Sequence, residues 1–354
     1  MSSAFELWLT PNITLSLVLE SESDVASFSR FLSRTLLWLR PALLRQALAY
    51  ELEQGPDLEL VSAGTLRIVD YAYWRTTRAH HASLYQPVPS ESLAYDIALL
   101  EGLEVPSSEH DLLSTALERV LITYAIADAA QEAADDPFPE DGSRDADLRT
   151  LWTQLKPDAP LPDMTGKHWQ KLGFQNTSPA TDFRGVGLLG LKALLYFAHT
   201  YGDRAAEIVH EAVDGGEHWY PFALASIHMT AFALELAVSR DLQLFLLRSV
   251  QAQPLSSDPS PEPSRSESTP AAGGPTSGRT SQEEPVDLEP LLRVASDLVL
   301  LFHAHWRQGQ YTVMQFEQVE KNFRAALRPW IRRGVLGGRA LGWERGDQGQ
   351  IKLD

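Results

Sequence analysis

The sequence predicts an all-α protein, a mostly helical bundle preceded by a less regular N-terminal segment. Beyond Ser90, apolar residues recur every three or four positions in successive segments of helical length. Glycine or proline separates these segments, as at Pro157 and at Gly215-Gly216. The chain has 354 residues, 44% of them hydrophobic, which is enough to bury a sizeable core.

Residues 1–88 give mixed signals. Short apolar runs lie on both sides of Pro11 and support no firm assignment. Residues 56–88 combine β-branched and aromatic residues with turn residues, which is typical of a short hairpin or an irregular packed segment. We therefore separate an N-terminal segment, 1–88, from a predicted helical domain over 89–336.

Within the N-terminal segment, residues 25–50 have the spacing of an amphipathic helix with a basic polar face. This stretch contains no carboxylate, and its charged side chains are those of Arg30, Arg34, Arg40 and Arg45. A basic amphipathic helix can lie on an anionic membrane surface. A helix packed on the core with its arginines in solvent has the same pattern, and both interpretations remain open.

Three helices are predicted ahead of the centre of the chain. They cover Ser90–Leu103, Ser108–Ala130 and Leu148–Leu155, and in each the apolar residues share one face. Residues 132–147 are acidic and contain two prolines and a glycine, so we expect a solvated loop there. Pro157 ends the third helix because proline cannot continue one.

Helical spacing resumes after the centre. The predicted segments are Tyr201–Val213, Phe222–Leu236, Leu242–Val250, Leu291–Trp306 and Tyr311–Trp330. Residues 252–287, rich in Pro, Ser, Gly and charge, cannot bury enough apolar surface to offset chain entropy. They are predicted to be a disordered insertion, and residues 337–354 a flexible tail.

The centre of the chain, Trp169–Ala198, joins a polar loop to a nearly uncharged apolar run. The run has helical spacing and predicts a buried helix. Thr181 and Asp182 are suited to accept hydrogen bonds from the backbone N–H groups of its first turn. Arg184 lies beside that turn, where the helix dipole disfavours a cation. Either a salt bridge to a carboxylate such as Asp182 or a contact with another molecule explains its presence.

The stretch GVGLLG, from Gly185 to Gly190, matches the G-x-G-x-x-G pattern of dinucleotide-binding loops. A polar segment precedes it where that fold requires a strand, and its surroundings read as helical, so nucleotide binding is rejected. We expect the glycines to let a backbone or an aromatic ring approach closely.

No metal site and no cofactor are predicted. His210-Glu211 begins the zinc motif H-E-x-x-H, but the fifth position is Asp214. His303 is predicted to be structural. The sequence contains no cysteine, which excludes disulfides and thiol catalysis and suits a reducing compartment.

Composition narrows the partners and the location. The net charge of −17 argues against nucleic acid as a partner of the whole chain. The N-terminus lacks the basic region of a secretory signal, and no run of about 18 apolar residues without a charge occurs. We expect a cytoplasmic protein, peripheral at a membrane if the basic stretch binds lipid.

The central motifs resemble a known family. W-x-x-x-G-F-Q, from Trp169 to Gln175, and P-x-T-D-F-R-G-x-G-L-L-G-L, from Pro179 to Leu191, resemble the signature of the ELMO (engulfment and cell motility) domain. The pattern is most similar to the ELMOD branch, whose members activate Arf and Arl GTPases. The resemblance extends from about Leu148 to Trp330, and His228 stands where the family usually has Asn.

The resemblance implies a function and assigns roles to residues. It implies a GTPase-activating protein for Arf-family (Arf/Arl) GTPases, with Arg184 as the catalytic arginine finger and with GTP and Mg²⁺ belonging to the partner. The residues implied to bind or position are Asp182, Gln175, Trp169, Phe183 and Gly185. The alternative is a non-catalytic scaffold or binding module for a small GTPase or its regulators. For the aromatic members we expect core packing around the loop.

Overall fold

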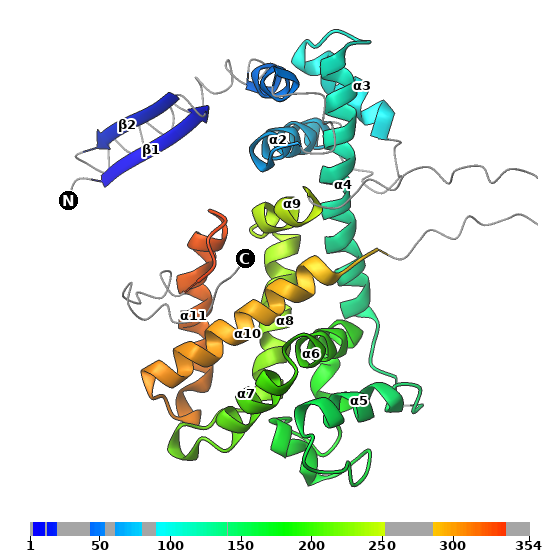
Figure 1. The fold of residues 1–354 in the computed structure, drawn as a ribbon, viewed down its shortest axis with the longest axis vertical. Coiled ribbons are helices and arrows are strands. Elements are labelled where there is room, and N and C mark those ends of the chain that lie inside the picture. The colour runs from blue at the N-terminus through cyan, green and yellow to red at the C-terminus, as the bar shows by residue number, and fades with distance from the viewer. Residues whose placement is uncertain are drawn as a thin grey trace, which may run out of the picture. The chain divides into compact units, whose positions relative to one another are not determined.

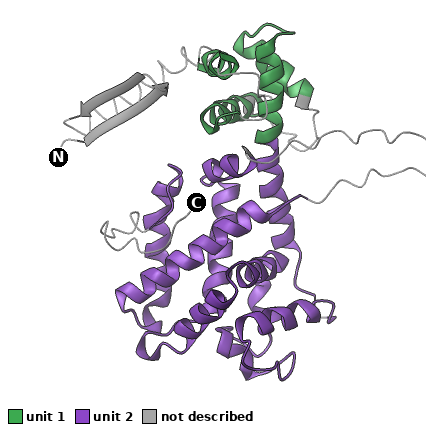
Figure 2. Cartoon of the chain, viewed as in Figure 1, with its two compact units in different colours: residues 1–120 green, residues 121–354 purple. Residues whose placement is uncertain are grey.

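The computed structural model describes residues 3–10, 13–19, 43–53, 61–79, 90–139, 141–251 and 286–337. The chain forms two compact units, residues 1–120 and 121–354 (Figure 2). The predicted insertion at 252–287 lies almost wholly outside the described residues, and so does the predicted tail at 337–354. Both stay predictions.

The first unit begins with a β-hairpin. β1 (Ser3–Thr10) pairs antiparallel with β2 (Ile13–Leu19), with Ser3 opposite Leu19. A helix over residues 43–53 follows, then α2 (Ala63–Ala79) and α3 (Ser90–Glu101), which pack against each other (Figure 1). The start of α4 (Ser108–Asp135) completes the unit, and the residues of α4 from Leu121 on belong to the second unit. The runs on both sides of Pro11, which the sequence left unassigned, are these two strands.

The predicted hairpin or irregular segment within 56–88 is wrong, because α2 occupies most of it. Leu66, Val69, Ala72 and Thr76 of α2 are all buried, and their spacing of three or four residues is helical. The β-branched and aromatic composition indicated a strand. Packing of this helical stripe decided the structure, since β-propensity depends strongly on context.

The predicted basic stretch is described only in part. Arg30, Arg34 and Arg40 lie outside the described residues. Arg45 is exposed on the helix over residues 43–53, and its Nη2 donates a hydrogen bond to Gly102 O at 2.7 Å. That bond gives Arg45 a role within the first unit. Contact of the stretch with a membrane stays a prediction.

The second unit is a helical bundle, and the all-α prediction is confirmed. Its helices are α5 (Asp145–Leu155), α6 (Gly187–Tyr201), α7 (Asp203–Val213), α8 (Phe222–Val238), α9 (Gln243–Gln251), α10 (Glu289–Gly309) and α11 (Phe316–Ile331). Short 3₁₀ helices lie between some of them, namely η1 (Lys167–Leu172), η2 (Pro179–Gly185), η3 (Gly216–His218) and η4 (Val313–Gln315). Each helix predicted from periodicity after residue 90 is present.

α8 is the centre of the bundle and packs on α6 and α10 (Figure 1). The segment Gly216–Val238 has the length and the mean hydropathy, 1.5, of a membrane span, but 72% of its most apolar window is buried inside the bundle. A helix that is apolar on all sides belongs either in a membrane or in a core. Its burial here among α6 and α10 makes it the core helix.

A buried polar chain crosses the bundle beside α8. The Tyr220 hydroxyl and His303 Nδ1 are 3.0 Å apart, and His303 Nε2 and Glu211 Oε2 are also 3.0 Å apart. Burial raises the pKa of Tyr220 and lowers the pKa of His303, so both groups stay neutral near pH 7. With every one of these polar atoms partnered, His303 is structural, as predicted.

Candidate functional site

The signature motifs surround a row of aromatic rings. Successive centroids are 5.4 Å apart for Trp152 and Trp169, 5.7 Å for Trp169 and Phe174, and 5.9 Å for Phe174 and Phe183. Phe138, from the loop after α4, stacks on Phe183 at 5.3 Å. Trp169 and Phe183 are fully buried, which confirms the expected core packing. This row gives the polar loop a rigid base.

The turn η2 directs three consecutive side chains to three sides. A 3₁₀ helix has about three residues per turn, so neighbouring side chains point about 120° apart. Phe183 enters the aromatic row, Asp182 faces the preceding loop, and Arg184 is exposed to solvent. The helical form of this short segment therefore sets the outward direction of the arginine.

Asp182 holds the loop that precedes it. Its Oδ2 accepts a hydrogen bond from the backbone N of Gln175 at 2.6 Å, and its Oδ1 accepts one from Asn176 Nδ2 at 2.9 Å. Thr181 Oγ1 lies 3.3 Å from the same Oδ1. The capping of the buried helix by Thr181 and Asp182 was therefore predicted wrongly. That helix, α6, starts at Gly187, and its N-cap Val186 makes no side-chain capping bond.

The end of α4 takes the place of a side-chain cap for α6. Leu188 N donates to Asp136 O at 3.0 Å, so a carbonyl at the end of α4 satisfies an orphan N–H of α6 (Figure 1). Gly187 has φ +46°, and a Cβ there would collide with the carbonyl oxygens of Ala134 and Asp136. The expectation that the glycines allow close approach is confirmed at this position.

Gly185 differs from the other glycines of the motif. A Cβ added to Gly190 would lie 2.9 Å from the ring of Phe183, whereas one added to Gly185 would meet no atom within 4 Å. Gly185 is exposed and does not have a positive φ. The fold of the domain gives no steric reason for a glycine at this position, which directly follows Arg184.

Arg184 forms neither a side-chain hydrogen bond nor an ion pair within the described part of the chain. The internal salt bridge with Asp182, one of the two explanations the sequence offered, is absent because that carboxylate is occupied by Gln175 and Asn176. The guanidinium is free in solvent, two residues beyond a tightly held carboxylate. This is the arrangement that a contact with another molecule requires.

Gln175 acts through its main chain. Its N is bound by Asp182, and its O accepts a hydrogen bond from Gln170 Nε2 at 3.2 Å, while its side chain is exposed. Sequence reasoning missed Asn176 and Phe138 as supports of the loop. Phe138 carried a signal, since it is the one aromatic residue of the acidic stretch 132–147.

His228, at the position where the resemblance implies Asn, has a hydrogen-bonding partner. Its Nδ1 lies 2.6 Å from Glu320 Oε2, and its backbone O accepts a hydrogen bond from Arg324 Nη2 at 2.8 Å. The imidazole therefore links α8 to α11. This site is on a different pair of helices from the signature loop.

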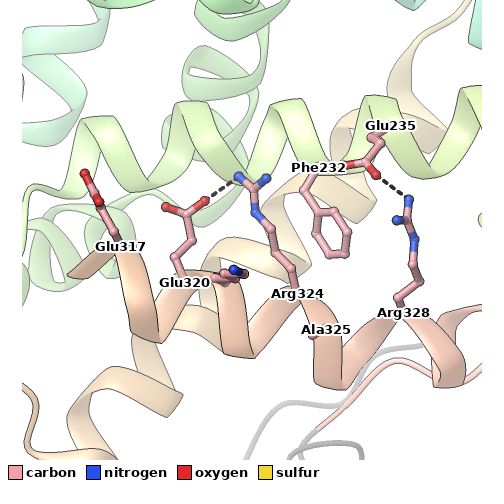
Figure 3. A pocket seen from close by; sticks show the side chains of 8 residues that line it. Phe232, Glu235, Glu317, Glu320, Arg324, Ala325 and Arg328 are labelled. Carbon is pink, nitrogen blue, oxygen red and sulfur yellow. Dashed lines mark hydrogen bonds and ion pairs between the residues drawn. The ribbon is translucent and has the colours of Figure 1, made fainter. Parts of the chain in front are cut away.

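A second candidate surface is the groove of about 360 Å³ between α8 and α11 (Figure 3). Four charged groups of its lining form ion pairs, Arg324 with Glu320 within α11 and Arg328 with Glu235 of α8. Arg328 also pairs with Asp241, which lies beyond the end of α8. The Arg324 guanidinium also lies 5.4 Å from the centroid of the Phe232 ring. These contacts join the two helices, so the groove is a structural seam. Among the described residues no group of three or more His, Asp or Glu could hold a metal ion.

Fold and site together define an α-helical domain that presents a rigid, arginine-bearing loop to solvent. The pattern of the ELMO/CED-12 family matches residues 131–320, more than half of the chain. The chain therefore belongs to the ELMO/CED-12 family. The matched range contains the aromatic row, both 3₁₀ turns of the loop and Arg184.

Curated relatives agree with this assignment. The chain is 31% identical to ELMO domain-containing protein B of Dictyostelium discoideum over 159 residues, 45% of this chain and 52% of that protein. It is 36% identical to ELMO domain-containing protein 2 of Mus musculus over 107 residues, 30% and 36% of the two chains. It is 34% identical to ELMO domain-containing protein 1 of Mus musculus over 125 residues, which cover 30% of this chain and 38% of that protein. The chain thus spans about half or less of these relatives, and no solved structure matches it.

Proposed function

We propose that this chain is a GTPase-activating protein for Arf-family GTPases and that it supplies Arg184 to the partner's active site. One observation carries the proposal: Arg184 is exposed, has no partner among the described residues, and sits on a turn fixed by Asp182 and Phe183. The signature resemblance supports the choice of Arf and Arl proteins as partners. The GTP and Mg²⁺ would belong to the GTPase.

The chemistry explains why a free arginine is needed. In phosphoryl transfer, negative charge spreads over the oxygens of the γ-phosphoryl group. A planar guanidinium that is always charged can contact two of these oxygens at once. Supplied by a partner protein, such a finger is worth about 10³–10⁵ in rate, roughly 4–7 kcal/mol of barrier.

Rigid support is the second requirement. A catalytic side chain works only when the surrounding structure holds it close to its productive geometry. Asp182 ties the arginine turn to Gln175, Phe183 anchors it in the aromatic row, and Gly187 packs against the end of α4. The side chain can move while its Cα stays in place.

Single-turnover GTP hydrolysis by a panel of Arf and Arl proteins tests the proposal. We expect the wild-type chain to accelerate at least one of them, and Arg184→Lys to remove that acceleration. The stability of the variant should stay within about 1 kcal/mol, because the residue is exposed and unpaired. Arg333→Lys, at an exposed arginine after α11, is the matched control and should keep full stimulation.

Two outcomes would contradict the proposal. One is full stimulation by Arg184→Lys, which would remove the arginine from the mechanism. The other is binding of GTP-loaded Arf or Arl proteins without faster hydrolysis, which would favour the non-catalytic binding module.

A further inference from the structure

The arginine turn η2 has η1 on one side. Gln175, which the turn holds through its backbone, also accepts the hydrogen bond from Gln170 of η1. Gly166 N donates to Thr177 O at 2.7 Å and fastens the start of η1 to the same loop. Through these contacts η1 forms one edge of the surface that surrounds the arginine.

This first edge is basic. Lys167 and Lys171 of η1 are both exposed. From residue 164 to residue 202 the one carboxylate in the sequence is that of Asp182, and both of its oxygens accept hydrogen bonds. Asp163, just before this range, accepts a hydrogen bond from Met164 N. The range itself has a local excess of positive charge, which is unusual in a chain with a net charge of −17.

The end of α4 and the loop after it form a second edge, and it is acidic. Leu188 N donates to Asp136 O and Phe138 stacks on Phe183, so this edge lies against η2 and the start of α6. Asp135 and Asp136 are exposed, and in the described ranges neither forms an ion pair. The sequence contains no lysine or arginine in residues 120–143.

We propose that these two edges dock the GTPase in a single orientation, with an acidic surface of the GTPase over η1 and a basic surface over the loop after α4. The inference rests on the proposed function for its partner class. Complementary potentials across an interface steer association and fix its register, while like charges disfavour other orientations. The edges therefore select the pose in which Arg184 meets the nucleotide.

Binding measurements with charge-reversed edges test the inference. The probe is each Arf and Arl protein of the panel, loaded with a non-hydrolysable GTP analogue, so that binding is read without catalysis. One variant combines Lys167→Glu with Lys171→Glu, and the other combines Asp135→Lys with Asp136→Lys. We expect each to weaken binding about tenfold or more at low salt and less at high salt, because the effect is electrostatic.

Control variants and turnover data separate the edges from general charge effects. Glu91→Lys with Asp96→Lys, exposed on α3, and Lys321→Glu with Arg333→Glu, exposed on and after α11, should bind as the wild type does. At saturating concentration the edge variants should lose much less of the maximal rate than Arg184→Lys does, since Arg184 is intact.

The outcomes distinguish this inference from the proposed function. Stimulation whose half-saturation is unchanged in both edge variants overturns the inference and leaves the function standing. Charge-dependent binding without hydrolysis supports the inference and overturns the function. If only one edge weakens binding, the two-edge orientation is overturned.

Discussion

The arginines of α11 and the arginine of the signature loop have opposite surroundings. Arg328 Nη2 lies 2.5 Å from Glu235 and Arg328 Nε lies 2.9 Å from Asp241, and Arg324 pairs with Glu320 (Figure 3). Arg184 has no such partner among the residues described. Arg328 joins α11 to α8, and Arg324 does so by donating to His228 O, whereas Arg184 makes no such contact within the described part of its own domain. A free arginine on a fixed turn is therefore available for another molecule.

The supporting structure differs as well. The α11 arginines lie on a regular helix, where each side chain can bend towards the carboxylate that suits it. Arg184 lies on a 3₁₀ turn in which the two preceding side chains are held in place. Asp182 accepts a hydrogen bond from the loop, and Phe183 is buried in the core. Exposed arginines are common on protein surfaces. Arg184 differs from most of them because the structure around it holds its backbone in place.

The largest expected effect separates the two kinds of arginine. Arg184→Ala should lower stimulated hydrolysis by about 10³-fold or more and change stability by less than about 1 kcal/mol. Arg328→Ala should do the reverse, keeping stimulation and losing about 1–2 kcal/mol of stability, since Glu235 loses this partner and Asp241 keeps only Arg332. Single-turnover assays and urea unfolding measure both. Equal losses of stability in Arg184→Ala and Arg328→Ala would contradict the difference between the two arginines.

The stability of the bundle should depend on the titration of Asp297, a half-buried carboxyl of α10, whereas Arg184 stays charged. Burial raises the pKa of Asp297 from 3.8 to about 6, against the lowering effects of Arg293 and Tyr201. The folded state thus favours the neutral acid. The stability that the Asp297 carboxyl contributes is therefore fully present below pH 3.8 and is lost as the pH rises through about 6. Above that pH the ionised carboxylate costs about 3 kcal/mol at most.

Asp297→Asn tests this titration. Relative to the wild type, the variant should gain about 2–3 kcal/mol of stability on going from pH 4 to pH 7.5, because it has no charge to bury. Unfolding curves at the two pH values give the difference. Parallel pH profiles of wild type and variant would show that the carboxyl is well solvated.

The support of the arginine can be weakened without touching the arginine. Asp182→Ala removes the acceptor of Gln175 N and Asn176 Nδ2 and should cost about 1–3 kcal/mol of stability. The maximal stimulated rate should fall, whereas Asp182→Asn, which keeps one oxygen acceptor, should recover part of it. Rate and stability are read on the same samples. An unchanged maximal rate in Asp182→Ala would show that the hydrogen bonds of Asp182 are not needed for stimulated hydrolysis.

The smallest effect is expected at Gly185. Gly185→Ala should change stability by no more than about 0.5–1 kcal/mol, since the added Cβ meets open space at an ordinary φ. If a partner's backbone packs against this position, its affinity should fall while the fold is untouched. Binding of a GTP-analogue-loaded partner measures this. Unchanged affinity would place the contact elsewhere on the turn.

Helices were predictable where one apolar stripe repeats, and less so where composition and packing disagree. α6, α8 and α10 follow directly from their spacing, because a buried face needs that period. α2 could not be predicted in this way, because its β-branched and aromatic residues fit a strand equally well. Only the structure shows that Leu66 and Val69 belong to a buried helical face. The start of α6 at Gly187 was missed because its cap comes from α4, about 50 residues earlier in the chain.

The candidate site was predictable in its residues and not in its contacts. The motif indicated Arg184, and the aromatic residues around it predicted a packed base. Asp182 had several possible partners at similar sequence distance, and only the folded loop shows that it binds Gln175 and Asn176. Contacts between segments distant in sequence, such as that of Phe138 with Phe183, leave no local pattern to read.

The loop between η1 and η2 is fastened largely through main-chain atoms, and this makes it a convenient place for a spectroscopic reporter. Thr177 contributes its carbonyl oxygen to Gly166 N, while its side chain is exposed. The sequence has no cysteine, so Thr177→Cys would introduce a unique thiol. A fluorophore attached there would signal the arrival of a second molecule at the loop and leave the aromatic row undisturbed.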